Sequence, residues 1–291
     1  MPSVSVRPFK LSLPKDLLGL RYTCHKNGKN IIPRPVPEAA ITPQRGSLSL
    51  RGSFEFLNGM SVRTASARID PPVQQVAFFD VDGTLAKSNV VYPFVIIRLA
   101  NLHFFVKLFW VPFFALKCIF YILLDQYDRK LFNKLFYQNY AGHDTAEKTV
   151  MANRVHKEYM HPRVFEGARQ HIAQLQEQGV RVVFVTGSLD FLVEPLAQEL
   201  GADAVIAAKL EEHDGKFTGN LDGPAISNEH KAVAMRRYAQ ESNLDLAHCQ
   251  AYGDSYADLA MLEAVGSPFV VRPSKRLSDI AKARGWPLMD W

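Results

Sequence analysis

The feature that most constrains the fold is the stretch over residues 76–85, which reads V-A-F-F-D-V-D-G-T-L. Four apolar residues in a row predict a short strand that is buried on both faces of a parallel sheet. The strand runs directly into two carboxylates, Asp80 and Asp82, and then into Gly83, which can take the positive φ of a sharp turn. Because ligands of open α/β sheets bind beyond the carboxyl ends of the strands, the two aspartates are candidate site residues.

Strands and helices alternate again from residue 163 onward. The patterns predict strands at 180–185, 204–207, 249–252 and 268–271, helices at 163–178, 191–200, 228–242 and 277–284, and a small hairpin at 211–220. Asn228 is the candidate N-cap of its helix. Such alternation implies right-handed β-α-β crossovers. We therefore expect an α/β fold, with a Rossmann-like parallel sheet flanked by helices, formed by residues 71–87 and 160–291.

Residues 88–159 interrupt the alternation and are predicted to form a helical, hydrophobic cap. Residues 104–124 are long enough to cross a bilayer, but Lys107, Pro112 and Lys117 interrupt them. A single span would also leave Asp80 on the opposite side of the membrane from every later motif. The sequence leaves two alternatives open: an apolar hairpin or interfacial helix that touches a membrane, or the core of a helical subdomain.

Residues 1–70 hold the positive charge of the chain. They contain eleven Lys or Arg and four acids, a net +7, whereas the whole chain carries +5, so residues 71–291 carry −2. Residues 1–70 are also rich in Ser, Thr and Pro and lack a sustained periodicity of hydrophobic residues. This composition predicts a transit peptide, with a plastid (chloroplast) as the favoured destination and a mitochondrion as the alternative; a plain disordered basic tail is the other interpretation. Because the net positive charge lies outside the predicted domain, nucleic acid is not an expected partner.

Polar clusters follow three of the predicted strands: Asp80 with Asp82, Thr186 with Gly187, and Asp254 with Asp258. A further candidate, Lys231, comes near the start of the helix before the last of these strands. In a parallel sheet all these strand ends lie at one edge, so the clusters can converge. Several carboxylates gathered there would repel one another, which calls for a hard divalent cation. Together these groups offer what phosphoryl transfer needs.

The motifs D-V-D-G-T, V-T-G-S and G-D-S-Y-A-D, with Lys231 between the last two, stand in the order and context found in the haloacid dehalogenase-like (HAD) hydrolases, which the chain resembles over residues 76–291. The helical insert between the first two motifs resembles the subclass that contains phosphoserine phosphatase. The resemblance implies a Mg²⁺-dependent phosphatase that acts on a phosphate monoester.

The resemblance also implies a role for each motif residue. Asp80 would be the nucleophile that forms an aspartyl-phosphate, and Asp82 the acid/base. Thr186 and the Gly187 amide would hold the phosphoryl oxygens, and Lys231 would bridge the nucleophile and the phosphate. Asp254 would bind Mg²⁺ together with Asp80 and the Asp82 carbonyl, while Asp258 would orient these ligands.

The apolar cap resembles the caps of bacterial phosphatidylglycerophosphate phosphatases and of the phosphatase-like domain attached to certain plant glycerol-3-phosphate acyltransferases. It favours a lipid or amphiphilic phosphate monoester such as a phospholipid, with peripheral membrane contact through the cap. A soluble small-metabolite phosphatase, similar to phosphoserine phosphatase, is the first alternative, although the insert offers only Arg98 and Arg129 for binding a polar substrate. A non-catalytic binding module is the second, and the complete set of motif residues counts against it.

Overall fold

The structure is a computed structural model that describes residues 75–291, except for the side chains of Gln126, Arg129 and Lys130. All the described residues belong to one compact unit. The predicted transit peptide over residues 1–70 lies outside the described residues.

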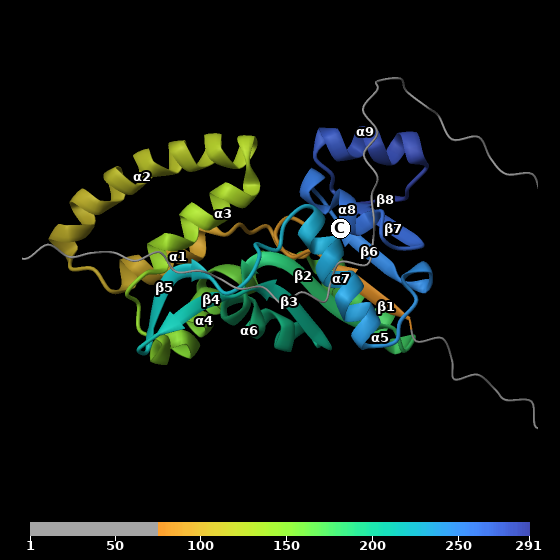
Figure 1. Ribbon diagram of the computed structural model, residues 1–291, viewed down its shortest axis with the longest axis horizontal. Coiled ribbons are helices and arrows are strands. Elements are labelled where there is room, and N and C mark those ends of the chain that lie inside the picture. Colours follow the sequence, from red (N-terminus) through yellow and green to blue (C-terminus); the bar gives the residue numbers. More distant parts are fainter. Residues whose placement is uncertain (1–74) are drawn as a thin grey trace, which may run out of the picture. The chain divides into compact units, whose positions relative to one another are not determined.

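A six-stranded parallel sheet forms the centre of this unit (Figure 1). In spatial order its strands are β3 (Ala204–Ala208), β2 (Arg181–Leu189), β1 (Val76–Phe79), β6 (Gln250–Gly253), β7 (Ser267–Val271) and β8 (Leu288–Met289). In the middle of the sheet, Phe79 of β1 pairs with Phe184 of β2 on one side and Tyr252 of β6 on the other. The three strands that precede the predicted aspartate and threonine motifs are therefore direct neighbours, and the strand order reverses at β1, where open sheets bind their ligands.

Helices cover both faces of the sheet because the side chains of the central strands alternate between two cores. Ala77 and Phe79 pack with residues of α5 (Glu166–Glu177) and α6 (Asp190–Leu200). Val76 and Phe78 pack with residues of α7 (Glu229–Glu241), α8 (Leu259–Leu262) and α9 (Lys275–Arg284). The prediction of an α/β fold with a Rossmann-like parallel sheet flanked by helices is confirmed.

The segment between β1 and α5 is helical, as predicted. Its elements are α1 (Val91–Ala100), α2 (Phe104–Tyr127), α3 (Arg129–Tyr137), η1 (Gln138–Tyr140), η2 (Thr145–Glu147), α4 (Lys148–Val155), η3 (His156–Met160) and η4 (His161–Arg163). Buried residues of α1, α3 and α4 join the same core as α5 and α6. The long helix α2 lies alongside α3 at the outer side of the insert (Figure 1). Only 11% of its most apolar 18-residue window is buried, so a fully packed core helix does not describe α2.

The predicted hairpin consists of β4 (Leu210–His213) and β5 (Lys216–Leu221), with Asp214 and Gly215 at positive φ in the turn. It pairs with the insert and not with the large sheet. The Phe217 N–H donates to the His143 carbonyl at 3.0 Å, and the Gly142 N–H donates to the Phe217 carbonyl at 2.8 Å. The hairpin therefore extends the helical insert.

Two local predictions differ from the structure, and one short strand was not predicted. Strand β2 does not end before Thr186 but continues to Leu189, past a shift in its pairing with β3 that follows Val185. Strand β8 has only two residues, too few for an alternating pattern to reveal it. Asn228 does precede α7, but within the described part of the chain its side chain makes no capping hydrogen bond, because its φ of 51° departs from the extended conformation of an ordinary N-cap.

Candidate active site

The loop after β1 brings Asp80 to the edge of the sheet. The Asp80 N–H continues the strand ladder by donating to the Tyr252 carbonyl of β6 at 2.9 Å. Three residues further on, the chain turns at Gly83, whose φ is +100°. A Cβ at Gly83 would overlap the Asp254 carboxylate. A side chain is therefore excluded there both by backbone conformation and by the closeness of a second acid.

Lys231 lies between two buried carboxylates. Its Nζ donates to Oδ1 of Asp80 and, at 2.6 Å, to Oδ1 of Asp258, and all three side chains are almost inaccessible to solvent. Burial disfavours the ammonium, but the charges of Asp258 and Asp80 outweigh burial and raise the pKa of Lys231 above its ordinary value. Lys231 therefore presents a permanent positive charge to Asp80.

Asp80, Asp254 and Asp258 gather carboxylate oxygens within 4.8 Å of one another. Burial is the largest cause that raises the pKa of Asp80 to about 7 and of Asp254 to about 8, and neighbouring carboxylates add to both rises. Burial also acts to raise the pKa of Asp258, but Lys231 and Ser255 outweigh it, so that this pKa falls below its ordinary value. One ammonium does not balance three carboxylates, and an all-oxygen set of this kind fits a hard divalent cation such as Mg²⁺.

Thr84 and Ser255 hydrogen-bond these carboxylates, and Trp291 in turn hydrogen-bonds the Thr84 backbone. The Thr84 hydroxyl lies 3.2 Å from Oδ2 of Asp80 and 3.4 Å from Oδ1 of Asp254, so it can donate to either. Ser255 donates to Oδ2 of Asp258 through its N–H at 3.0 Å and its hydroxyl at 2.8 Å. The Trp291 indole N–H donates to the Thr84 carbonyl at 2.9 Å. With Asp258 committed to Lys231 and Ser255, Asp80 and Asp254 are the side chains best able to hold the cation.

The Asp82 carboxyl group is held by two serine hydroxyls. Ser88 donates to Oδ1 at 2.6 Å, and Ser188 donates to Oδ2 at 2.5 Å. A hydroxyl can donate to a carboxylate and, after rotation, accept from a carboxylic acid. Both protonation states of Asp82 can thus be hydrogen-bonded in place, as an acid/base requires.

A small cavity of about 30 Å³ lies against Asp80 and Asp82. Its lining includes Thr186, Gly187 and Lys231, together with Asn133 of α3 and Ser227 before α7. The Thr186 oxygen accepts the Ser188 N–H at 3.1 Å, which leaves the Thr186 hydroxyl hydrogen available to a ligand. Among the described residues Ser227 Oγ is buried without a hydrogen-bond partner. The cavity therefore offers donors and a cation to a group the size of a phosphoryl.

A second cavity, of about 630 Å³, is also lined by Asp82. Ser88, Asn89 and Asp125 contribute polar atoms to it, but most of its lining is apolar and comes from α1 and α2: Val91, Tyr92, Val95, Leu99, Trp110, Val111, Phe114, Ala115, Cys118, Tyr121 and Ile122. Asp82 lines both cavities and so lies where they meet. This arrangement offers a polar pocket for one end of a ligand and an apolar channel for the other.

The structure brings all seven predicted residues to one edge of the sheet, either around the small cavity or within the carboxylate group: Asp80, Asp82, Thr186, Gly187, Lys231, Asp254 and Asp258. Their individual roles, including metal binding by the Asp82 carbonyl, stay predictions. Sequence reasoning missed Ser88, Asn133 and Ser227. Ser188 was also given no role, although it is the last residue of the V-T-G-S motif. Its place in that motif was the signal that could have marked it as a site residue.

Comparison with known proteins is consistent with this arrangement. A family model described as haloacid dehalogenase-like hydrolase matches residues 77–263. A protein of Mycobacterium tuberculosis named a probable phosphatase is 35% identical over 226 residues, which cover 76% of this chain and 77% of that protein. Another, named a phosphoserine phosphatase, is 29% identical over 234 residues, covering 79% and 76%. A crystal structure of a Bordetella pertussis protein of unknown function superimposes with a TM-score of 0.66 at 23% identity, covering 75% of this chain and 99% of that one.

Proposed function

The chain belongs to the haloacid dehalogenase-like hydrolase family, and we propose that it is a Mg²⁺-dependent phosphomonoesterase acting through an aspartyl-phosphate on Asp80. The observation that carries this proposal is the contact between Asp80 and Lys231 at a small cavity lined by hydrogen-bond donors. Mg²⁺, held by Asp80 and Asp254, would neutralise charge on the phosphoryl oxygens.

In the first half-reaction, a carboxylate oxygen of Asp80 forms a bond to phosphorus while the bond to the leaving oxygen breaks. Lys231 and the Thr186 hydroxyl bind the peripheral oxygens, where the charge of a loose transition state gathers. Asp82 gives its proton to the leaving oxygen, which departs as an alcohol.

In the second half-reaction, Asp82 is ionised and takes a proton from water. The water oxygen bonds to phosphorus, the bond from phosphorus to Asp80 breaks, and inorganic phosphate leaves. The Ser88 and Ser188 hydroxyls hold Asp82 through this change of protonation state, because each can reverse its hydrogen bond.

We also propose that the substrate is a lipid or amphiphilic phosphate monoester. The apolar cavity over Asp82 supports this, because it would receive the chain of an amphiphile while the phosphate binds at Asp80. The names of relatives favour phosphoserine as a second candidate. The described residues that line the cavity include no Arg or Lys to pair with the carboxylate of phosphoserine, which favours the first candidate.

Peripheral membrane binding through α2 is part of this proposal. Residues 104–125 of this helix have a mean hydropathy of 1.8 and are long enough to span a bilayer by length and composition alone. The helix is flanked by α1 and α3, whose buried residues pack with the same core, so both of its ends stay with the catalytic unit. A helix tethered in this way can lie in the membrane interface with its aromatic face among the acyl chains.

Phosphate release from matched monoesters tests the proposed activity. The panel contains a phosphatidyl-type monoester in mixed micelles, a short-chain analogue, phosphoserine and p-nitrophenyl phosphate. We expect turnover with Mg²⁺, its loss on EDTA treatment, and a loss of at least about 10⁴-fold in Asp80→Asn, with the largest kcat/KM on the long-chain monoester. Undiminished turnover by Asp80→Asn would end the covalent mechanism, and a preference for phosphoserine would select the second candidate.

We propose that the protein is located in a plastid, and this proposal rests on the composition of residues 1–70 alone. A fluorescent protein fused behind residues 1–70 should enter chloroplasts in plant cells. Entry into mitochondria would select the alternative destination, and a signal that stays in the cytosol would show that residues 1–70 are not a transit peptide.

A further inference from the structure

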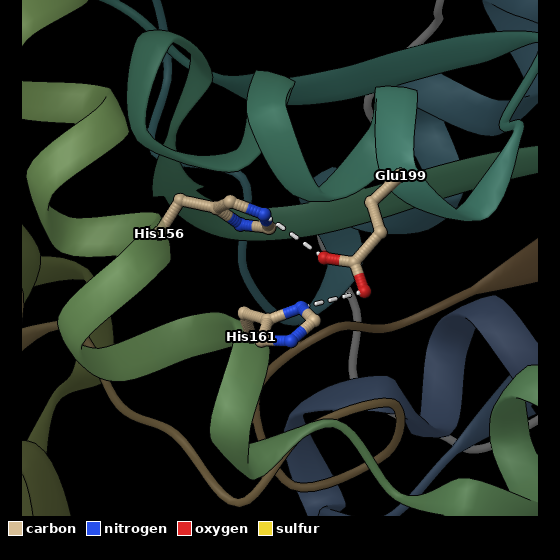
Figure 2. Close-up of side chains that lie close together, drawn as sticks. All are labelled: His156, His161 and Glu199. Atoms are coloured by element: carbon tan, nitrogen blue, oxygen red, sulfur yellow. Dashed lines mark hydrogen bonds and ion pairs between the residues drawn. The ribbon is translucent and has the colours of Figure 1, made fainter.

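A second cluster of candidate metal ligands is formed by His156, His161 and Glu199 (Figure 2). His156 belongs to η3 and His161 to η4, both at the end of the insert, whereas Glu199 belongs to α6, which packs on the sheet. One ligand atom from each lies within 4.8 Å of the other two. The cluster therefore joins the insert to the sheet-bearing part of the molecule.

The pairing of the two histidines depends on an unusual turn. In an α-helix, residues five apart are about 140° apart around the axis and do not share a face. Residues of η3 form a π-helical turn, in which the His161 N–H donates to the His156 carbonyl. This wider turn brings positions five apart onto one side, and π-turns of this kind are frequent at functional sites. Figure 2 shows both rings directed at the Glu199 carboxylate.

The contact between His156 and Glu199 is an ion pair and lacks the geometry of a hydrogen bond. Nε2 of His156 and Oε2 of Glu199 are 2.9 Å apart, as Figure 2 shows, but among the described residues the buried Oε2 has no partner that meets hydrogen-bond geometry. Nδ1 of His156 is likewise buried without one, so no hydrogen bond fixes the tautomer and Nε2 can present its lone pair.

The other carboxylate oxygen is already engaged. Oε1 of Glu199 lies 2.9 Å from Nδ1 of His161 and pairs with the Arg169 guanidinium. Burial acts to raise the pKa of Glu199, but the hydrogen bonds from His161 and Arg169 outweigh it and keep the carboxyl group ionised. Arg169 thus orients the carboxylate through one oxygen and leaves the other facing His156.

We propose that His156, His161 and Glu199 bind a borderline divalent cation of the zinc class. Two imidazole nitrogens and one carboxylate oxygen form a donor set typical of Zn²⁺. Mg²⁺ prefers oxygen ligands, so the carboxylates around Asp80 and this cluster select different metals. A cation here links the end of the insert to α6 and stabilises the contact between them.

The test is a calorimetric titration of the full chain with Zn²⁺ in excess Mg²⁺, which occupies the carboxylate site. We expect about one Zn²⁺ per chain, with affinity at least about tenfold weaker in His161→Ala and in Glu199→Gln. His248→Ala is the matched control, because this histidine is exposed beside a carboxylate, Asp245, but belongs to neither group of candidate metal ligands found among the described residues. Zn²⁺ should also raise the melting temperature of the wild type and of the control, but not of His161→Ala.

His161 is the more exposed of the two rings, so its replacement tests the site even where Glu199→Gln fails to fold. Absence of Zn²⁺ binding by the wild type would overturn the proposal and leave a hydrogen-bonded cluster around Arg169. Binding by His161→Ala with unchanged affinity would overturn it as well, because the bound Zn²⁺ would then lie elsewhere.

Discussion

The sheet edge and the outer helix α2 reverse the usual distribution of polar and apolar side chains. At the sheet edge, Asp80, Lys231 and Asp258 are buried. On α2, Phe105 and Phe109 are 75% and 76% exposed. Burying a charged group is unfavourable because the group loses its hydration. Exposing a large aromatic ring is unfavourable because water must be ordered or displaced at its apolar surface.

The two regions differ in how far neighbouring groups offset this unfavourable free energy. The carboxylates are relieved in part by Lys231 and by hydroxyl and N–H donors, and an added cation would complete the balance. The exposed rings of α2 have no comparable relief within residues 75–291. The buried polar site is nearly complete within the described residues, whereas the exposed apolar face of α2 would be covered only by a surface from outside, which we propose to be a membrane.

Removing the positive charge of Lys231 from the buried site should have the largest effect. Lys231→Met deletes the charge that faces Asp80 and Asp258 and leaves both acids buried without it. We expect kcat/KM to fall at least about 10³-fold and the free energy of unfolding to fall by about 3–5 kcal/mol, measured by phosphate release and urea denaturation. Lys275→Met is the control, because the exposed pair of Lys275 with Asp279 contributes about 0–1 kcal/mol. Equal stability of the two variants would refute the account of Lys231.

Altering the proton donor should slow the reaction while leaving the fold intact. In Asp82→Asn, Ser88 and Ser188 can still hydrogen-bond the side chain, so stability should change little, whereas turnover of an alkyl monoester should fall by about 10²–10⁴-fold. p-Nitrophenolate leaves without protonation, so a burst of p-nitrophenolate should precede slow turnover as phosphorylated Asp80 accumulates. A single slow phase with both substrates would contradict the assignment of Asp82.

Crowding the metal ligands should weaken Mg²⁺ activation. Gly83→Ala places a methyl group against Asp254 at a backbone φ of +100°, so we expect the Mg²⁺ concentration for half-maximal activity to rise by about tenfold. Gly215→Ala is matched for backbone strain, since its φ is +74° and nothing lies within 4 Å of the added Cβ. If both variants require the same Mg²⁺ concentration as the wild type, Asp254 does not hold the cation.

Making the exposed helix polar should have the smallest and most selective effect. Phe105, Phe109 and Phe113 are exposed, whereas Trp110 stacks on Phe114 with 4.6 Å between ring centroids and lines the apolar cavity, so the test leaves it unchanged. Their replacement by Ser should release the protein from liposomes and lower turnover of a lipid monoester several-fold. Turnover of p-nitrophenyl phosphate and the melting temperature should stay the same.

The control for this variant replaces Val150 and Val233, exposed residues outside α2, by Ser. Unchanged liposome flotation of the triple variant would refute membrane contact through α2. Equal loss on both substrates, with a lower melting temperature, would show that these rings stabilise the fold instead.

The central sheet and the motif residues could be predicted because their signals are local. Each strand is a short apolar run, and each motif follows directly at its end, so parallel topology alone brings Asp80, Thr186 and Asp254 to one edge. Whether α2 is exposed could not be predicted in this way. An apolar run of this length is compatible with a core, an interface or a span, and the small buried share of α2 in the structure argues only against a fully packed core helix.

The site residues that were not predicted from the sequence show the same limit of local signals. Asn133 reaches the small cavity because α3 packs over the sheet edge, where the Tyr137 hydroxyl also donates to the Gly187 carbonyl at 2.5 Å. Ser227 enters through the irregular backbone before α7. Contacts between segments so far apart in the chain leave no periodic signal in either one.

The hydrogen bond from Trp291 to the Thr84 carbonyl gives the molecule an optical reporter of its own site. Thr84 lies within hydrogen-bonding distance of Asp80 and Asp254 through its hydroxyl, so its backbone and side chain connect the indole to the carboxylates. The colour and intensity of indole emission respond to the local electric field and to hydrogen bonding at the ring nitrogen. We therefore expect the binding of Mg²⁺ or of a phosphoryl group at this site to change the intrinsic fluorescence, without a label, and the contribution of Trp291 to be isolated by comparison with Trp291→Phe.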